Sequence, residues 1–137
     1  MKLAKRPEID AYFKSPPSHS VGALIYGKDR SQVIERATVL AKQIVSDIND
    51  PFNVSVLTDS DIDGDPGRLE GELQSLSLMG GRRLIRLKFF SEKAALDKQV
   101  AQALKAHAAG EYNKDAFIII EAGGLGGDSS LRRLADA

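Results

Sequence analysis

A run of apolar residues at helical spacing dominates the first half of the chain. They recur every three or four positions, which places them along one face of an amphipathic helix. Asp29 precedes them as the expected N-cap, and Gln32 follows three residues later as its capping-box partner. The face consists of Val33, Ile34, Ala37, Leu40, Ala41, Ile44, Val45 and Ile48. The pattern therefore predicts a long helix with one wide side buried against a core.

Four short apolar runs are typical of buried β-strands. They occupy residues 21–26, 54–57, 83–90 and 116–120. Helical spacing fills the gaps between them, and it predicts helices from about Pro66 and over residues 94–108. The apolar faces of these two helices carry Leu69, Leu73 and Leu76 in the first, and Leu96, Val100, Leu104 and His107 in the second. Two further helices are predicted at residues 8–14 and from Leu131.

Strands that alternate with helices need crossover connections, and crossovers produce parallel neighbours. We therefore expect an α/β fold with a mainly parallel sheet and helices on both of its faces. Residues 1–137 should form a single domain. The last predicted helix begins at Leu131 and meets the end of the sequence after barely two turns. This suggests a domain truncated at its C-terminus, a fragment of a longer chain.

Composition and charge narrow the function classes. Nineteen basic and nineteen acidic side chains cancel, so no overall field attracts the chain to DNA or to an anionic membrane. The absence of cysteine excludes a disulfide framework and a thiolate metal site. No run is long enough to cross a bilayer, and no signal peptide precedes the first strand. We therefore expect a cytoplasmic protein with no membrane partner.

The turn after the first strand is where a nucleotide-binding domain keeps its phosphate loop. Such a loop needs G-x-x-x-x-G-K-[ST], with a lysine for the phosphate charge and a hydroxyl for magnesium. Counted from Gly27, the G-K-[ST] positions fall on Gln32, Val33 and Ile34. Lys28 comes too early, and the connection from Gly27 to Arg30 is too short to surround a phosphate. The sequence favours a plain strand-to-helix turn without a nucleotide cofactor.

The fourth strand ends in Glu121, at the position where an ATPase would carry an aspartate for magnesium. Without a phosphate loop to serve, Glu121 is interpreted as a strand-end carboxylate at the carboxyl rim of the sheet. The glycine-rich turn after it, GGLGGDSS, offers an anion site at a helix N-terminus. Asp128 or Ser129 would cap the same helix, which is the commoner use of such residues.

Residues 59–70, DSDIDGDPGRLE, satisfy the pattern of a calcium loop through Asp59, Asp61, Asp63 and Glu70. Pro66 occupies the position where such loops carry an aliphatic residue, and the preceding residues resemble a strand rather than a helix. Asp65 followed by Pro66 is also typical of a helix start. We therefore expect no metal site, with a calcium-regulated interaction domain as the alternative.

Two further groups of polar residues carry weaker signals. Arg82, Arg86 and Lys88 alternate on one side of the third strand, which indicates an edge strand protected against aggregation and only secondarily a surface for DNA or protein. His19 and His107 are too far apart in sequence to indicate a metal site or a catalytic triad. His107 lies on the apolar side of its helix, where a structural role is expected.

Leu78 and Met79 do not fit the apolar face of their predicted helix. At about 100° per residue, Leu78 lies about 180° from Leu69. Gly80 and Gly81 follow the pair directly and end the helix. The pair is therefore either a local contact at the helix end or an apolar plug for a partner's pocket, and the sequence pattern leaves both interpretations open.

Several stretches together resemble the N-terminal domain of the delta subunit of bacterial DNA polymerase III, the clamp-loader subunit that opens the sliding clamp. They are LIYGKDRSQVIERA, DPFNVSVLTDSDIDGDPGRLEGEL, LSLMGGRRLIRLK and FIIIEAGGLGGDSSLRRL. The resemblance implies a nucleotide-hydrolase-like domain of the AAA+ type that has lost its nucleotide site. It also implies no intrinsic catalysis, although the domain would belong to a DNA-synthesising nucleotidyltransferase holoenzyme.

The resemblance further implies that Leu78 and Met79 enter a hydrophobic pocket of the beta sliding clamp. Clamp-binding peptides favour glutamine, leucine, serine or aspartate, leucine, phenylalanine, and residues 75–79 match at Leu76, Ser77 and Leu78. The other clamp-loader subunits would bind mainly through regions absent from these 137 residues, and DNA would be reached indirectly. The alternative from the enzyme class is a small phosphotransferase or hydrolase derived from a phosphate-loop protein.

Overall fold

The alternation of strands and helices predicted from the sequence is present in the computed structural model. The structure describes residues 22–27, 29–45, 47–50, 53–63, 65, 67–74, 82–90, 94–110, 112–113 and 115–123. Its strands are β1 (Gly22–Tyr26), β2 (Val54–Thr58), β3 (Arg83–Phe89) and β4 (Ala116–Ala122). Its helices are α2 (Arg30–Ile44), α3 (Asp59–Ile62), α4 (Arg68–Gln74) and α5 (Ala94–Ala108). The predicted helices at residues 8–14 and from Leu131 lie outside the described residues.

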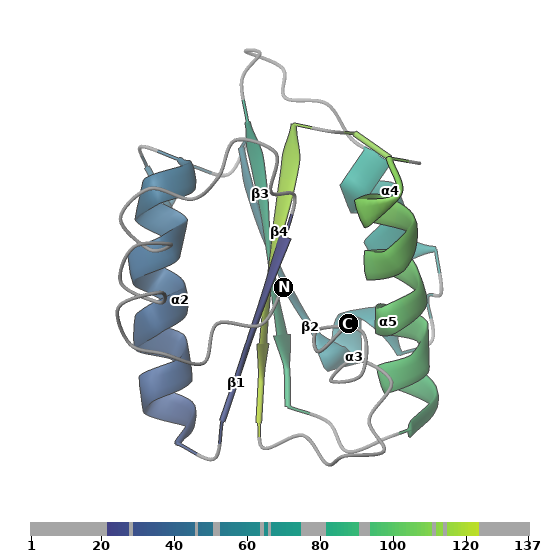
Figure 1. Cartoon of the computed structure of the whole chain (residues 1–137), viewed down its shortest axis with the longest axis horizontal. Helices are drawn as coiled ribbons and strands as arrows, with labels where there is room; N and C mark the ends of the chain where they lie inside the picture. Colours follow the sequence, from purple (N-terminus) through teal and green to yellow (C-terminus); the bar gives the residue numbers. More distant parts are fainter. Residues whose placement is uncertain are drawn as a thin grey trace.

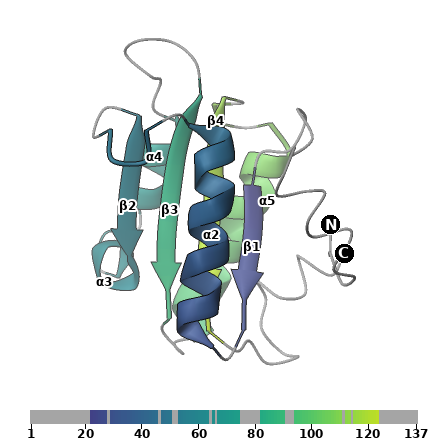
Figure 2. The same ribbon diagram turned by 90° about the vertical axis from the view of Figure 1, so that its left-hand side faces the viewer.

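The four strands form one sheet in the order β1-β4-β3-β2, and every pair of neighbours is parallel. Figure 1 shows this sheet nearly edge-on, with α2 along one face and α3, α4 and α5 along the other. Figure 2 shows the sheet face-on, with α2 in front of it and running alongside the strands. The predicted α/β fold, with a parallel sheet covered by helices on both faces, is therefore confirmed.

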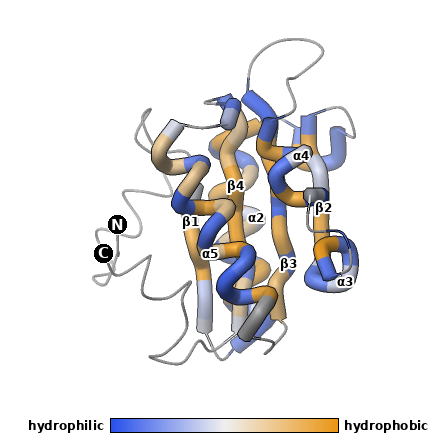
Figure 3. The backbone as a smooth tube through the Cα atoms, turned by 90° about the vertical axis from the view of Figure 1, so that its right-hand side faces the viewer, coloured by the Kyte–Doolittle hydropathy of each residue, from blue (hydrophilic) through white to orange (hydrophobic). Residues whose placement is uncertain are grey.

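Two apolar cores lie on the two faces of the sheet. Strand residues alternate between them, because successive side chains of a strand point to opposite sides. In β3, Leu84 faces α2 whereas Ile85 and Leu87 belong to the core under α4 and α5. Figure 3 shows β3 and β4 as mainly hydrophobic strands behind the more mixed helices α4 and α5. Parallel strands buried on both faces carry continuous apolar sequences such as FIII in β4 for this reason.

The amphipathic face predicted for α2 is the face that the structure buries. Its buried residues are Val33, Ala37, Leu40, Ala41 and Ile44. The backbone N–H of Gln32 donates to Oδ1 of Asp29 at 3.3 Å, so Asp29 is the predicted N-cap. The helix ends at Ile44, earlier than the apolar pattern suggested, and Val45 and Ile48 pack against the same core from the following turn.

The edge-strand interpretation of the basic residues 82, 86 and 88 was wrong. β3 lies between β4 and β2, so it is an interior strand of the sheet. Arg86 is buried, and the guanidinium of Arg82 lies 5.3 Å from the centre of the Phe117 ring. The alternating charges that suggested an exposed edge are instead tolerated inside the sheet because each finds a partner or a route to solvent.

His107 has the structural role that its position in the helix predicted. Its ring is buried, its Nε2–H donates to the backbone oxygen of Ala116 at 2.7 Å, and it stacks on Tyr112. The contact joins the C-terminal turn of α5 to the start of β4. His19 lies outside the described residues.

Gly22 is required where β1 passes under α5. A Cβ atom at this position would lie 2.8 Å from Cγ2 of Ile118 and 3.2 Å from Cδ1 of Leu104. We expect Gly22→Ala to destabilise the domain by about 1–3 kcal/mol, because Ile118 lies on an interior strand and has little room to move. Chemical denaturation measures the change.

Gly71 provides the matched control. It lies in α4 and is exposed, and a Cβ atom there would meet no atom within 4 Å. Gly71→Ala should therefore stabilise the domain by roughly 0.5–1 kcal/mol through the lower entropy of the unfolded chain. Equal effects of the two substitutions would contradict the close approach at Gly22.

Candidate functional site

The turn between β1 and α2 has the short form predicted from the sequence. β1 ends at Tyr26, Asp29 caps the helix, and α2 begins at Arg30. The Asp29 carboxylate therefore lies at the positive end of the α2 dipole and accepts the N–H of Gln32. In a phosphate loop, backbone N–H groups at this place would face a phosphate. In this protein the Asp29 carboxylate lies in front of these N–H groups, and its negative charge opposes the binding of a phosphate there.

Arg30, the first residue of α2, is engaged with an aromatic ring. Its Cζ atom lies 4.0 Å from the centre of the Phe90 ring, which follows β3. Stacking of a guanidinium on an aromatic face is a cation–π contact. The contact joins the α2 terminus to the carboxyl edge of the sheet, where parallel α/β domains usually bind their ligands.

Glu121 forms a buried ion pair rather than a solvated carboxylate at the rim. It is fully buried, and its two oxygens accept hydrogen bonds from Nε and Nη2 of Arg86 at 3.2 and 3.1 Å. Nη2 of Arg86 also donates to the hydroxyl of Thr38 at 3.2 Å. The prediction placed Glu121 correctly near the end of β4, but its partner was missed. A buried carboxylate whose charge is already balanced by two nitrogens of one guanidinium is poorly suited to bind a magnesium ion.

The acidic calcium-like pattern is divided between two short helices. Asp59 and Asp61 belong to α3, a helix that the sequence analysis missed, and Glu70 belongs to α4. The backbone N–H of Thr58 donates to Oδ2 of Asp61 at 2.9 Å, and the Thr58 hydroxyl lies 3.2 Å from the same oxygen. These two hydrogen bonds, the backbone one foremost, lower the pKa of the exposed Asp61 carboxyl.

Asp61 thus caps the start of α3, which precedes the helix predicted from about Pro66; that predicted helix is α4, which begins at Arg68. The signal was present as Thr58-x-x-Asp61, a threonine followed by an acid at capping-box spacing. Within the part of the chain that the structure describes, no three acidic or histidine side chains gather closely enough to hold a metal ion.

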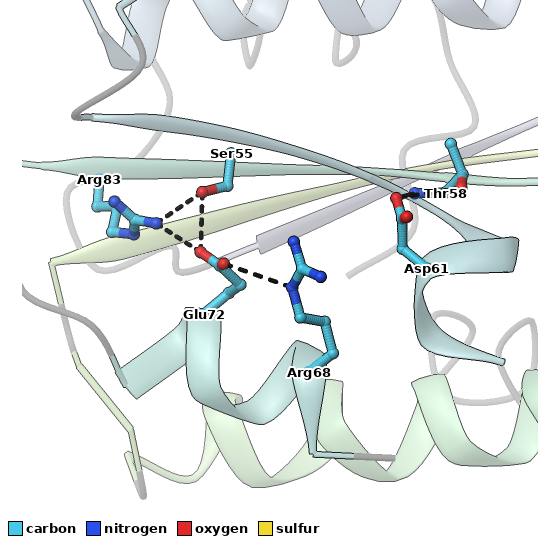
Figure 4. A network of polar contacts seen from close by, with 6 residues as sticks. All are labelled: Ser55, Thr58, Asp61, Arg68, Glu72 and Arg83. Atoms are coloured by element: carbon cyan, nitrogen blue, oxygen red, sulfur yellow. Dashed lines mark hydrogen bonds and ion pairs between the residues drawn. The ribbon is translucent and has the colours of Figure 1, made fainter. Parts of the chain in front are cut away.

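A second polar network joins β2, α4 and β3 (Figure 4). Glu72 is at its centre: the Ser55 hydroxyl donates to Oε2 of Glu72 at 2.8 Å, and Nη2 of Arg83 donates to the same oxygen. Nη2 of Arg83 also reaches the Ser55 hydroxyl at 2.6 Å. Nε of Arg68, one turn earlier in α4, lies 3.7 Å from Oε1 of Glu72. This network was not predicted, because Ser55 lies 17 residues from Glu72 and 28 from Arg83 in the sequence.

The network keeps Glu72 ionised. Burial alone would raise the pKa of its carboxyl, but the hydrogen bonds from Ser55 and Arg83 and the charges of Arg83 and Arg68 outweigh burial and lower that pKa. At neutral pH the side chain is therefore a carboxylate between two guanidinium groups.

The predicted clamp-contacting residues Leu76, Leu78 and Met79 lie outside the described residues. The structure does describe both sides of their segment, because α4 ends at Gln74 and β3 begins at Arg83. Leu69 and Leu73 are buried, which confirms the apolar face predicted for that helix up to its last described turn. Among the residues that are described, no helix is long and apolar enough to cross a membrane.

The fold is similar to that of two solved proteins. A Bacillus subtilis DNA clamp loader delta protein matches with a TM-score of 0.64 and 18% identity over 94% of this chain. A DNA polymerase III gamma subunit-related protein from Thermotoga maritima matches with a TM-score of 0.58 and 16% identity over 91%. The chain spans 39% and 43% of the length of these two proteins. No curated protein sequence matches the chain.

The parallel sheet, its strand order and these matches define the class: an α/β domain with the fold of a solved clamp-loader delta protein. The sequence assigns the family within this class. The family model described as DNA polymerase III, delta subunit, matches residues 24–128, which is more than half of the 137 residues. The chain belongs to the DNA polymerase III delta subunit family.

Proposed function

We propose that this domain binds the beta sliding clamp and helps to open it during DNA replication. It acts as the clamp-contacting domain of a clamp-loader delta subunit and has no nucleotide binding or catalysis of its own. The match to the delta subunit family over residues 24–128 carries the proposal, because it includes the segment between α4 and β3. The other loader subunits, and DNA through them, would be engaged mainly by regions outside these 137 residues.

Leu78 and Met79 are the proposed clamp contact, with Leu76 as a supporting residue of the same motif. Support comes from the buried face of α4, since Leu69 and Leu73 point into the core. If the helical periodicity continues, Leu78 lies on the opposite side from Leu69. An apolar pair on the outer side of a helix end is suited to insertion into a partner's pocket.

Binding to the cognate clamp tests the proposal directly. The chain is passed over immobilised clamp in a surface plasmon resonance experiment, and saturable binding is expected. The same chain after substitution of Leu78 and Met79 by alanine is the control for the site of contact. Absence of saturable binding by the unaltered chain at concentrations up to about 100 μM, equivalent to less than roughly 5.5 kcal/mol, would contradict the proposed function.

The domain is expected not to bind ATP. The turn after β1 has no phosphate-loop lysine or hydroxyl at the required positions, and the Asp29 carboxylate occupies the α2 terminus. Micromolar binding needs about 8 kcal/mol, which a site without these anion donors has no means to supply. Isothermal titration calorimetry with ATP and magnesium is the measurement. A saturable heat in the micromolar range would favour the alternative, a phosphotransferase or hydrolase.

A further inference from the structure

The two elements that border residues 75–82 are connected by side chains. Glu72 lies in the last turn of α4, and Arg83 is the first residue of β3. Their ion pair spans the segment between them, and both groups also contact the Ser55 hydroxyl on β2 (Figure 4). The three side chains therefore hold the end of the helix, the start of one strand and the neighbouring strand at fixed separations.

Burial distinguishes this connection from an ordinary surface salt bridge. The side chains of Arg83 and Glu72 are 11% and 20% exposed, whereas that of Arg68 is 45% exposed. Exposed ion pairs contribute little because water screens them and the side chains remain free to move. A partly buried carboxylate that accepts hydrogen bonds from both a hydroxyl and a guanidinium is held more firmly.

Backbone hydrogen bonds also hold the same two elements in place. The N–H of Asn113 donates to the backbone oxygen of Leu73 at 3.2 Å, and the N–H of Arg83 donates to that of Asp115 at 2.9 Å. Both partners lie in the turn before β4. The end of α4 and the start of β3 are therefore fixed to one turn by their backbones and to each other by the Glu72–Arg83 pair.

We propose that Glu72, Arg83 and Ser55 are positioning residues for the clamp contact. By fixing both ends of residues 75–82, they restrict the conformations from which Leu78 and Met79 approach the clamp. The proposal rests on the proposed function, since it assigns these three residues a part in the same contact. Binding becomes stronger when a segment is restrained beforehand, because less conformational freedom is lost on association.

Arg83→Met and Arg68→Ala form the test pair. Arg83→Met removes the connection between α4 and β3 and keeps a side chain of similar length. Arg68→Ala removes a cation from the same carboxylate but leaves that connection in place, because Arg68 and Glu72 belong to one helix. Two quantities are measured for each variant at a temperature where it is fully folded: amide hydrogen exchange of residues 75–82 in the free chain, and affinity for the immobilised clamp.

For Arg83→Met we expect exchange in residues 75–82 to accelerate by about tenfold and clamp affinity to fall by about five- to tenfold. Arg68→Ala should change neither quantity by more than about twofold. The exchanged pair Glu72→Arg with Arg83→Glu restores an ion pair between the same two positions. It should recover part of the lost affinity and slow the exchange of residues 75–82 again, because both quantities depend on the same connection.

The outcomes separate the two proposals. Unchanged exchange in Arg83→Met, or faster exchange with unaltered clamp affinity, overturns the positioning role. An equal loss of affinity in Arg68→Ala also overturns it, because that variant keeps the ends of the segment connected. Failure of the unaltered chain to bind the clamp contradicts the proposed function, and with it the positioning of a clamp contact.

Discussion

Replacing Leu78 and Met79 together with alanine is expected to weaken clamp binding by at least about a hundredfold. Each side chain, if fully buried in the clamp, contributes roughly 1.5–3 kcal/mol, so the pair accounts for about 3–6 kcal/mol of the binding free energy. Surface plasmon resonance against immobilised clamp measures the loss. Met79→Phe should tighten binding, because phenylalanine is the residue that clamp-binding peptides favour at the last position of the motif.

The melting temperature of the same double variant decides between the two interpretations of this pair. Residues exposed in the free domain contribute little to its stability. The free energy of unfolding should therefore change by no more than about 0.5 kcal/mol, and the melting temperature should change little. Val39→Ala is the matched control, since Val39 is an exposed apolar residue of α2, the helix on the face of the sheet opposite to α4. A large drop in melting temperature would show that the pair belongs to the core, and unchanged affinity would exclude it as the clamp contact.

The second large effect is expected in the sheet, where Arg86→Met should destabilise the domain by about 3–5 kcal/mol. The substitution leaves the Glu121 carboxylate fully buried without its counter-charge. Chemical denaturation at neutral pH measures the free energy of unfolding. Thr38→Val serves as the control, because it removes only the third member of the network and should cost about 1 kcal/mol.

The double variant Arg86→Met with Glu121→Leu should recover most of the lost stability. Removing both charges together avoids an unpaired buried ion, and apolar replacements of buried pairs are often neutral or stabilising. A double variant as unstable as the sum of the two single ones would show that the two side chains act independently. If Arg86→Met alone lowered the free energy of unfolding by less than about 1 kcal/mol, the pair would contribute no more than an exposed ion pair does. That result would contradict the burial of the site.

The sequence predicted the fold better than it predicted the polar contacts within it. The strands, α2 and α5 follow from periodicity, because a buried face must repeat with the period of its element. α3 was missed because a helix of one turn has no period to read, although Thr58 and Asp61 carry its capping signal. β3 was wrongly placed at an edge because the sequence of one strand does not show which strands lie beside it in the sheet.

The two ion pairs show why the polar contacts could not be predicted from the sequence. Arg86 and Glu121 are 35 residues apart, and Glu72 and Arg83 are 11 apart on different elements. From the sequence, Arg86 was interpreted as part of an exposed edge and Glu121 as a carboxylate at the rim, and neither was expected to be the other's partner. The parallel register brings Lys88 and Ile25 beside Glu121 and places Arg86 on the same face two residues away. Without that register, no local pattern distinguishes a buried guanidinium from a solvated one.

The order of the strands in the sheet differs from their order in the chain, and this has a consequence for synthesis. Among the described strands β1 pairs only with β4, and Gly22 is the register partner of Ile118. A ribosome adding about 5–20 residues per second needs roughly 5–20 s to pass from one partner to the other. Until β4 has emerged, the nascent β1 has no edge to join, and the buried face of α2 has no Phe117 or Ile119 to cover. β1 and α2, the first of the described elements to be translated, are therefore among the last to be enclosed.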